Sequence, residues 1–418
     1  MKDIEERNNM EEWKKIKISD ICNRITSGGT PKSTIAEYYG GNIPWLNTKE
    51  INFNRIFKTE KSITDLGLKS SSAKLITINS VVVAMYGATA GKVAITKIPL
   101  TTNQACCNLS IDSTKADYRY VYYALSNDYS RLASLANGGA QQNLNAQLIK
   151  DFEIIYPSLE KQKRIANILS SLDDKIELNN RINANLEEQA QALFHRWFVD
   201  FEFPNEEGLP YKSNGGGFVE SELGKIPEEW TVEKLSKILY ISKNGINPLK
   251  TPEILYTNYS LPAYDTGMIP EELKGSHVLS NKYIVTDNTI LFSKLNPRIK
   301  RIWYVEKTNK DSVCSTEFIP YKATINELTY FVYCLINSPI FYQSAMALVN
   351  GSTGSHQRFH PQETLDFKIS MNKDKMIVFS KLIAPMIKLI TKNILESHSL
   401  SQLRDTLLPK LMNNYINL

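Results

Sequence analysis

The stretch EEWKKIKISDI, Glu11 to Ile21, returns in the second half of the chain as EEWTVEKLSKI, Glu228 to Ile238. Each copy places Glu-Glu-Trp before a short run whose apolar residues have helical spacing. A chain of 418 residues is too long for one ordinary hydrophobic core, so two or more domains are expected. The echo therefore predicts two related halves.

Three further pairs of segments follow in the same order. The turn and β-branched run TINSVVVAM, from Thr77, is matched by VTDNTILFS, from Val285. The aromatic runs YVYYALSN, from Tyr120, and YFVYCLINS, from Tyr330, both predict helices. Two Gly-rich loops, NGGAQQN and NGSTGSHQR, each run into a strand pattern that ends Asp-Phe-x-Ile. Four echoes in one order predict an internal duplication, and loop insertions explain the changing offset.

The order of elements within a half is mixed. Short strand patterns lie between turn signals such as SGGTP, Ser27 to Pro31, with a few helices interspersed and no regular βαβ alternation. This order predicts the α/β class, as a mixed α+β arrangement in two similar globular domains.

Each half ends in a long helical pattern. Apolar residues recur near heptad spacing from Leu159 to Asp200, with no Gly or Pro between Glu160 and Val199. The second pattern, from Asp374 to Met412, contains Pro385, which should bend it, and Pro409, which should disturb its last turns. An antiparallel coiled coil is favoured over two separate helices packed on their own domains.

The predicted seam between these helices includes three asparagines. At such a position a buried amide lowers stability but fixes the register of the two helices. The seam residues are Leu169, Leu172, Ile176, Asn179, Asn183, Leu186, Leu193, Met386, Asn393, Leu400 and Leu407. The predicted boundaries are 1–157 for the first globular domain, 158–203 for the first long helix, 204–373 for a connector and the second globular domain, and 374–418 for the second long helix.

The composition argues against a membrane-spanning or a secreted protein. No apolar run approaches the roughly 18 to 20 residues that cross a bilayer, and the charged N-terminus predicts no signal peptide, so a cytoplasmic location is expected. The 5 cysteines form no C-x-x-C pair and are expected to be buried thiols.

Motifs for catalysis are missing. GATAGKV, Gly87 to Val93, has too few residues between its glycines for a phosphate loop, and Val93 stands where Ser or Thr should hold Mg²⁺. His356 and His360 lie four apart beside Pro361, which argues against a helical metal site. No G-x-S-x-G elbow or dinucleotide-binding fingerprint appears. We expect a chain that is not an enzyme by itself and that holds no metal or cofactor.

Both predicted globular domains have more basic than acidic residues. Residues 13–157 contain 17 Lys and Arg against 10 Asp and Glu, and residues 230–370 contain 15 against 12. KLNPRIKR, Lys294 to Arg301, gathers four cations, which suits phosphate contacts but also suits a solvated hairpin. Amide, hydroxyl and cationic side chains in the turn-rich loops are of the types that read base edges, although each loop alone is also an ordinary polar loop. The candidate DNA-binding residues are Ser27, Thr30, Lys32, Lys49, Lys92, Thr102, Asn103, Gln104, Gln141, Gln142, Asn143, Lys294, Arg298, Lys300, Arg301, Thr353, Ser355, His356, Gln357 and Arg358.

Taken together, these residues resemble the specificity subunit of type I restriction-modification systems over essentially the whole chain. The resemblance is carried by WKKIKISDI and WTVEKLSKI, by SGGTPKS and NIPWLNTKEI, by PSLEKQKRIANIL and LFHRWFVDFEFP around the first long helix, and by GKIPEEW and LRDTLLPKLMNN. The second half departs from the pattern, because it has KNGINP and AYDTGM where SGGTPKS would be expected.

The resemblance implies two target recognition domains, each reading one half of a split, asymmetric DNA sequence, with the helices setting the unread spacer. It also implies double-stranded DNA, two adenine-methylating modification subunits and ATP-dependent restriction subunits as partners. S-adenosylmethionine, ATP and Mg²⁺ would then belong to those partners. Two alternatives remain at this point: a stand-alone methyltransferase or restriction fusion enzyme, which would need an Asn/Asp-Pro-Pro-aromatic motif that is not found, and a protein-binding scaffold.

Overall fold

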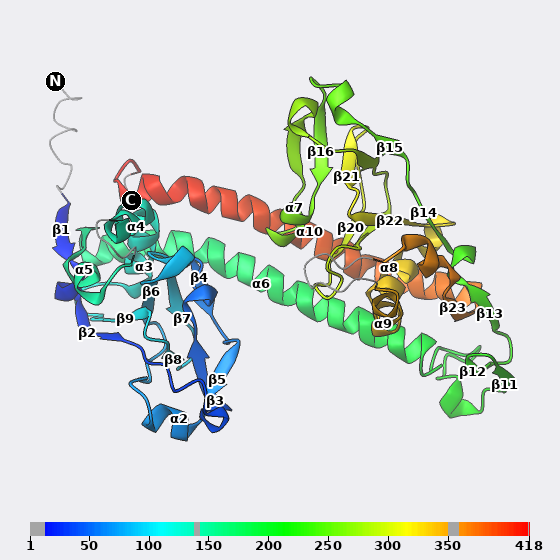
Figure 1. Ribbon diagram of the computed structural model, residues 1–418, viewed down its shortest axis with the longest axis horizontal. Helices are drawn as coiled ribbons and strands as arrows, with labels where there is room; N and C mark the ends of the chain where they lie inside the picture. Colours follow the sequence, from blue (N-terminus) through cyan, green and yellow to red (C-terminus); the bar gives the residue numbers. More distant parts are fainter. Residues whose placement is uncertain (1–12, 138–142, 350–358, 417) are drawn as a thin grey trace. The chain divides into compact units, whose positions relative to one another are not determined.

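The computed structural model describes residues 13–137, 143–349, 359–416 and 418 (Figure 1). The chain divides into two compact units. The first unit comprises Met1–Asp174 and Ser401–Leu418, and the second comprises Lys175–Leu400. We call residues 13–157 the first lobe and residues 230–371 the second lobe. Two 40-residue helices, α6 (Leu159–Phe198) and α10 (Lys373–Met412), each contribute segments to both units.

The first lobe is built on mainly antiparallel strands with short helices. Its strands are β1 (Lys14–Lys17), β2 (Cys22–Ser27), β3 (Tyr39–Leu46), β4 (Asn54–Ile56), β5 (Lys61–Ile63), β6 (Val81–Ala84), β7 (Val93–Thr96), β8 (Thr101–Thr102), β9 (Cys106–Ile111) and β10 (Glu153–Tyr156). Its helices and 3-10 turns are η2 (Ile18–Ile21), η3 (Ala36–Tyr38), η4 (Thr48–Glu50), α2 (Asp65–Lys69), η5 (Gly87–Thr89), α3 (Tyr118–Asn127), α4 (Tyr129–Ser134), η6 (Leu135–Asn137) and α5 (Ala146–Asp151). The main sheet has the order β2-β9-β6-β7-β4, and a smaller sheet has the order β5-β3-β8.

The second unit contains a hairpin followed by the second lobe. Its strands are β11 (Phe218–Ser221), β12 (Gly224–Pro227), β13 (Thr231–Lys234), β14 (Leu239–Ile241), β15 (Gly245–Ile246), β16 (Leu255–Tyr259), β17 (Glu271–Lys274), β18 (Lys282–Ile284), β19 (Thr289–Ser293), β20 (Ile302–Val305), β21 (Ser312–Ser315), β22 (Phe318–Ala323) and β23 (Lys368–Met371). Its shorter helices and 3-10 turns are η7 (Lys212–Asn214), η8 (Leu235–Lys237), η9 (Pro248–Lys250), α7 (Leu261–Asp265), η10 (Gly275–His277), η11 (Asn326–Leu328), α8 (Thr329–Asn337), α9 (Pro339–Ala347) and η12 (Pro361–Asp366).

The two lobes repeat one strand order. The first has β2-β9-β6-β7 and the second has β14-β22-β19-β20, with antiparallel neighbours throughout. The smaller sheet of each lobe also has one parallel pair, β3 with β8 and β16 with β21, and in the first lobe β4 adds a second parallel pair with β7. The second lobe extends its smaller sheet with β15 and β18. The predicted internal repeat and the mixed α/β class are therefore confirmed.

The duplicated Glu-Glu-Trp stretch closes each lobe. β1 pairs antiparallel with β10, from Lys14 opposite Tyr156, and β13 pairs with β23 in the same way, from Thr231 opposite Met371. Each partner strand stands immediately before a long helix. The helical spacing read from this stretch is wrong, because strand pairing overrides a weak local preference and only a 3-10 turn follows each strand.

The turns before the central strands also repeat. Asn79 has φ 63° and lies two residues before the first residue of β6, and Asn288 has φ 59° and lies directly before β19. Asparagine tolerates this left-handed conformation better than most residues do. The strands predicted in TINSVVVAM and VTDNTILFS are confirmed, as are the helices α3 and α8.

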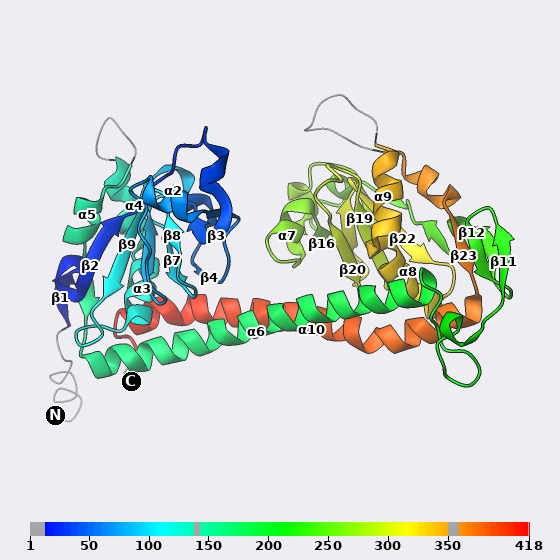
Figure 2. The ribbon, with the colours of Figure 1, turned by 90° about the horizontal axis from the view of Figure 1, so that it is seen from below.

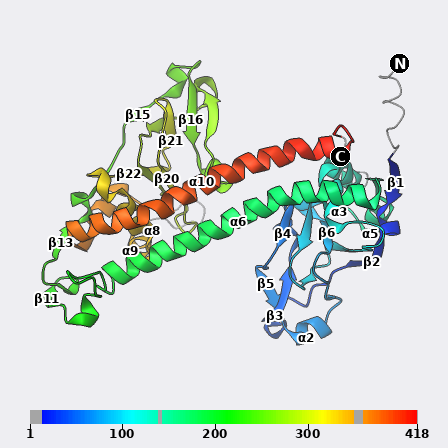
Figure 3. The same cartoon turned by 180° about the vertical axis from the view of Figure 1, so that it is seen from behind.

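Each unit has its own apolar core. In the first unit, Leu125 of α3 packs in a cluster with Leu169 of α6 and Leu411 of α10. In the second unit, Phe194, Phe198 and Phe379 of the long helices pack around Phe331 of α8 in tilted and edge-to-face contacts. Figure 2 shows α8 above the long helices, and Figure 3 shows α3 and β4 beside α6. Burial on one face of each long helix explains why these sequences are helical over so many turns.

Both prolines lie inside α10. Pro385 and Pro409 are exposed, and the helix continues through each of them to Met412. The N–H of Asn413 still donates to the Pro409 carbonyl at 3.1 Å, so Pro409 does not end the helix early.

The segment after α6, predicted to be a connector, is folded. Phe203 stacks between Tyr211 and Trp230, with ring centroids 4.6 and 5.0 Å away. β11 and β12 form a hairpin from Phe218 to Pro227. The segment is thus part of the second unit, because its aromatic side chains join that core.

In the part of the chain that the structure describes, no helix combines the length and the apolar character needed to span a membrane.

Candidate nucleic-acid interface

Four loops of the first lobe meet at one edge of its sheets. The N–H of Gly29, after β2, donates to Thr102 O at 2.8 Å, and Asn103 N–H donates to Leu46 O at 3.0 Å. Met85, after β6, donates to Ala105 O at 2.8 Å and accepts from Leu144 N–H at 2.9 Å. These bonds join the loops after β2, β3, β6 and β8 to the segment that begins at 143. Sequence segments predicted separately to contact DNA thus form one loop cluster.

The Gly-Gly pair of SGGTP makes this convergence possible. A Cβ on Gly28 would lie 2.2 Å from Thr102 O, and one on Gly29 would lie 2.1 Å from Ala73 N. The indole N–H of Trp45 donates to Gly29 O at 2.9 Å in a buried contact. The two glycines are therefore required by close packing of backbone on backbone.

The outward side chains of this cluster are polar. Ser27, Thr30, Lys32, Gln104 and Asn143 are all exposed. Hydroxyl, amide and ammonium groups in this position can donate to or accept from base edges and phosphates.

Two further candidate lysines are engaged with the protein. Lys49 forms an ion pair with Glu60 at 2.5 Å, and hydrogen bonding to Glu60 raises the lysine pKa. Lys92 donates to Asn52 Oδ1 at 2.7 Å and lies over the Phe53 ring. Both are near the cluster, but each would have to exchange a protein partner for DNA.

Thr102 is a correction to the candidate set. Its side chain is fully buried, and its Oγ1 accepts from Asn108 Nδ2 at 2.9 Å. It supports the cluster from inside and cannot present its hydroxyl to DNA. Asn103 is half-buried, with Oδ1 3.1 Å from Cys106 Sγ.

The second lobe has a corresponding loop edge. Ser242 N–H, after β14, donates to Pro320 O at 2.9 Å, and Lys294 N–H, after β19, donates to Glu317 O at 3.0 Å. The basic segment Lys294 to Arg301 leaves the sheet here and returns where Ser293 N–H donates to Arg301 O at 3.0 Å.

The four cations of this basic segment have different roles. Arg301 makes a bidentate ion pair with Asp265, at 2.7 and 2.8 Å, and this arginine lowers the pKa of the aspartate. Lys300 donates to Asn337 O at 2.6 Å, and burial lowers its pKa. Arg298 is exposed, with no side-chain partner among the described residues, and Lys294 is half-buried. Lys294 and Arg298 are thus better placed than Lys300 and Arg301 to contact phosphate.

The remaining loop candidates lie outside the described residues. They are Gln141, Gln142, Thr353, Ser355, His356, Gln357 and Arg358.

Amide contacts join the two long helices within the second unit. Asn393 Nδ2 donates to Asn183 Oδ1 at 2.8 Å, and Asn179 Nδ2 donates to Glu396 Oε2 at 2.8 Å and lies 3.3 Å from Ser397 Oγ. From one contact to the next, the residue number rises on α6, from Asn179 to Asn183, and falls on α10, from Ser397 to Asn393. These segments of the two helices therefore run antiparallel.

The apolar seam candidates line the same helices. Leu169 is fully buried, whereas the others are half-buried: Leu172, Ile176, Leu186, Leu193, Met386, Leu400 and Leu407. Leu169 lies in the core of the first unit and Leu407 packs against that core, whereas Leu193 and Met386 pack against the core of the second unit.

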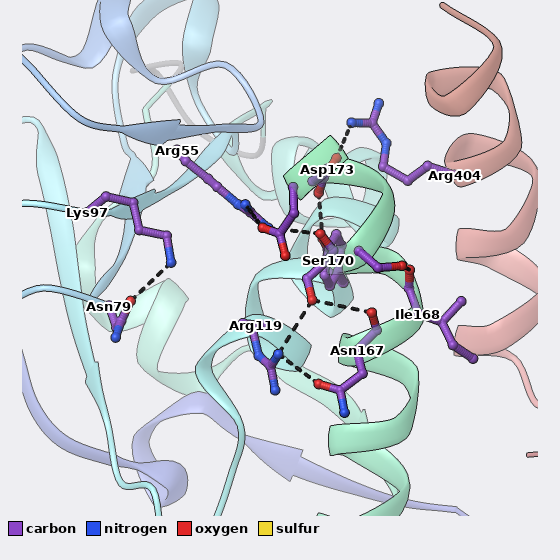
Figure 4. A network of polar contacts seen from close by, with 12 residues as sticks. Arg55, Asn79, Lys97, Arg119, Asn167, Ile168, Ser170, Asp173 and Arg404 are labelled. Atoms are coloured by element: carbon purple, nitrogen blue, oxygen red, sulfur yellow. Dashed lines mark hydrogen bonds and ion pairs between the residues drawn. The ribbon is translucent and has the colours of Figure 1, made fainter. Parts of the chain in front are cut away.

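A polar network fixes the first lobe to α6 (Figure 4). Arg119 of α3 donates to Asn167 Oδ1 at 2.8 Å, and Arg55 of β4 pairs with Asp174. Asp173 accepts from Tyr123 Oη and, at 2.7 Å, from Arg404 Nη1 of α10. One carboxylate therefore joins α3, α6 and α10 in this unit.

The second lobe has its own carboxylate on α6. Glu187 accepts from Tyr333 Oη at 3.0 Å and from the Asn337 amide. Burial raises the pKa of Glu187.

Sequence analysis missed Asp173 and Glu187. The available signal was position: each carboxylate follows a seam residue by four, Leu169 and Asn183, and so lies on or near a face that should be apolar.

No metal site was found within the described part of the chain, where no group of three or more His, Cys, Asp or Glu side chains could hold an ion. The cysteines are unpaired, and burial raises the pKa of Cys22, Cys107 and Cys314 to about 12. Thiols of this kind are poor nucleophiles.

Comparison with known proteins identifies related chains. Residues 10–188 match the family model of the type I restriction modification DNA specificity domain. The type I restriction enzyme MjaIX specificity subunit of Methanocaldococcus jannaschii is 30% identical over 96% of this chain and 93% of its own length. The HindI specificity subunit of Haemophilus influenzae is 24% identical over 69% of this chain and 74% of its own length.

A solved structure shares the fold. The S subunit of a type I restriction-modification system from M. genitalium superposes with a TM-score of 0.57, at 19% identity, over 97% of each chain. These relatives do not support the alternatives of a self-sufficient methyltransferase or a peptide-binding scaffold. The identity across nearly all of both chains in the first comparison shows that this protein belongs to the family of type I restriction enzyme specificity subunits.

Proposed function

We propose that each lobe reads one half of a bipartite, asymmetric DNA target through its loop edge, for chemistry performed by other subunits. As a member of the specificity-subunit family, the chain is the non-catalytic subunit that carries sequence recognition. The observation that carries the proposal is the repeated strand order with different loops at the same edge. A duplicated frame with different loops suits two similar partner contacts and two different half-sites.

The proposed DNA contacts divide by chemistry. Lys32, Lys294 and Arg298 would neutralise phosphates, which positions the lobes and makes binding depend on salt. Amides and hydroxyls would read bases, and each mismatched pair would cost about 1 to 3 kcal/mol. The base-reading candidates are Ser27, Thr30, Gln104, Asn143 and the residues of the two loops outside the described ranges.

The helices are proposed to form an antiparallel coiled coil that sets the spacer between half-sites. Asn179 and Asn393 are both the 21st residue of their helices, and Asn183 and Ser397 are both the 25th. The contacts Asn179–Ser397 and Asn183–Asn393 are therefore images of each other under the repeat, which supports an internal twofold relation within the helix pair. In this scheme residues 1–157 and 204–373 hold the recognition domains, and 158–203 and 374–418 form the spacer helices.

The proposed partners are double-stranded DNA, two modification subunits and restriction subunits, in the cytoplasm. Val378, Leu382 and Leu389 of α10 are 53%, 51% and 42% exposed, although large apolar side chains usually avoid water. This apolar stripe supports docking of a modification subunit on the helix. S-adenosylmethionine, ATP and Mg²⁺ are proposed to reside on the partners.

The test mixes the purified chain with its modification subunit and labelled S-adenosylmethionine. We expect adenine methylation at a bipartite site only when both proteins are present, with DNA affinity that falls steeply as salt rises. Methylation by the chain alone, or salt-independent binding, would contradict the proposal.

A further inference from the structure

Two tyrosines at equivalent places in the repeat bind carboxylates on the same helix. Tyr123 and Tyr333 are the fourth residues of YVYY and YFVY, in α3 and α8. Tyr123 donates to Asp173 in the first unit, and Tyr333 donates to Glu187 in the second. Both acceptors belong to α6, 14 residues apart along it.

These contacts are buried on the lobe side. Tyr123 is 2% exposed and Tyr333 is 8% exposed. Burial and the neighbouring carboxylate together raise the pKa of each tyrosine, so the hydroxyl keeps its proton and remains a donor. A buried carboxylate that loses its donor is costly, and the partners therefore hold one relative position.

Each contact is connected to a further element of its unit. Asp173 also accepts from Arg404 of α10, as Figure 4 shows. Glu187 also accepts from Asn337, whose carbonyl accepts from Lys300 at 2.6 Å in the basic segment. In the second unit the helix is thus connected through two hydrogen bonds to a segment proposed to contact DNA.

We infer that Tyr123–Asp173 and Tyr333–Glu187 are the anchors that fix the two lobes to α6 and make the complex strict about spacer length. The inference rests on the proposed function and adds to it the residues that act without touching DNA. They are positioning residues. If a lobe could shift on the helix, both half-sites could be engaged on DNA whose spacer is one base pair too long or too short.

The experiment uses the chain assembled with its modification subunits. Methylation rates are measured on duplexes that keep both half-sites and carry the native spacer n, or n−1, or n+1 base pairs. Tyr123→Phe and Tyr333→Phe remove one hydroxyl each and keep the ring. We expect each to lower the ratio of the native rate to the n±1 rates about tenfold, since a hydrogen bond to a charged group is among the stronger ones.

Matched controls separate anchoring from general stability. Tyr415→Phe changes an 80% exposed tyrosine, and Glu188→Gln changes the exposed neighbour of Glu187, so both should keep the ratio. Glu187→Gln should lower the ratio as Tyr333→Phe does. Equal loss of rate on all three spacers, or an unchanged ratio in a folded variant, would overturn the inference. Failure of the wild-type complex to methylate any split site would instead overturn the proposed function.

Discussion

The two lobes share a frame and differ at the edge that we propose to face DNA. In the first lobe, the loop after β2 is pressed onto neighbouring backbone through Gly28 and Gly29, and a Cβ would have no room. In the second lobe, the glycine that follows β14 is Gly245, at the start of β15, where a Cβ would have its nearest neighbour 3.9 Å away. The main sheet has the same strand order in both lobes, whereas the packing of the loop edge differs between them. This difference is expected if the frame serves equivalent partners and the edges serve different DNA sequences.

The largest expected effect follows directly from this difference. Gly29→Ala should destabilise the first unit by about 3 kcal/mol or more, because the new methyl overlaps backbone atoms that cannot move independently. Gly245→Ala should change stability by less than about 1 kcal/mol, since the space is open. Thermal unfolding of both variants measures the contrast. Similar melting of the two variants would show that the first edge is not tightly packed.

The second effect concerns the helices, where the halves are most alike. Asn393→Ala should cost about 1 to 2 kcal/mol, because it removes a buried amide and leaves Oδ1 of the half-buried Asn183 without its donor. The double change Asn183→Leu with Asn393→Leu should be at least as stable as the wild type but less strict in register. Chemical unfolding measures the first result, and cysteine cross-linking along the helices measures the second. A double variant as unstable as the single one would argue against a register role.

The third effect separates two arginines of the basic segment. Arg298→Ala should reduce the slope of log DNA affinity against log salt by about 1 and leave stability unchanged. Arg301→Ala should leave that slope unchanged and cost about 1 kcal/mol, because its ion pair with Asp265 is largely buried on the arginine side. Titration of DNA at several salt concentrations checks both. A reduced salt slope for Arg301→Ala and an unchanged slope for Arg298→Ala would mean that the Arg301–Asp265 ion pair breaks when DNA binds.

The smallest effect is a difference in acid stability between equivalent turns. Lys307 and Thr308 lower the pKa of Asp287 to about 2, whereas the first lobe has Ile78 at this place. A depressed pKa stabilises the folded state above the unfolded value near 4, and this contribution is lost as the pH falls through about 2.

Asp287→Asn should therefore remove a small contribution, about 0.5 kcal/mol or less because the aspartate is well exposed, between pH 4 and 2. Denaturant unfolding of both proteins across this range measures it. Equal pH dependence would show that the turn is not stabilised by the charge.

Much of the fold could be predicted from the sequence, for identifiable reasons. The echoes from Thr77 and Tyr120 are long and regular, so both strands and helices were recognised. The helical spacing after Trp13 gives a wrong prediction, because β1 is held by pairing with a strand about 140 residues later, which no local pattern reveals. Local composition predicts only a connector after α6, because the aromatic contacts of this segment with Trp230 depend on the folded core.

The candidate site was less predictable. Residue type alone could not distinguish Thr102, which is buried, from Thr30, which is exposed. In KLNPRIKR all four cations look alike in sequence, yet Asp265 and Asn337, from other elements, engage two of them. Sequence gives the chemistry of a side chain, but its partners come from the tertiary structure.

Mapping methylated adenines across a genome, in cells that carry this chain and its modification subunit, tests the central claim most directly. If each lobe reads DNA independently, the map should contain one motif with two specified parts around an unread spacer of fixed length. Replacing residues 230–370 by the same region of a relative should change only one part. A continuous motif, or a replacement that alters both parts, would contradict the account.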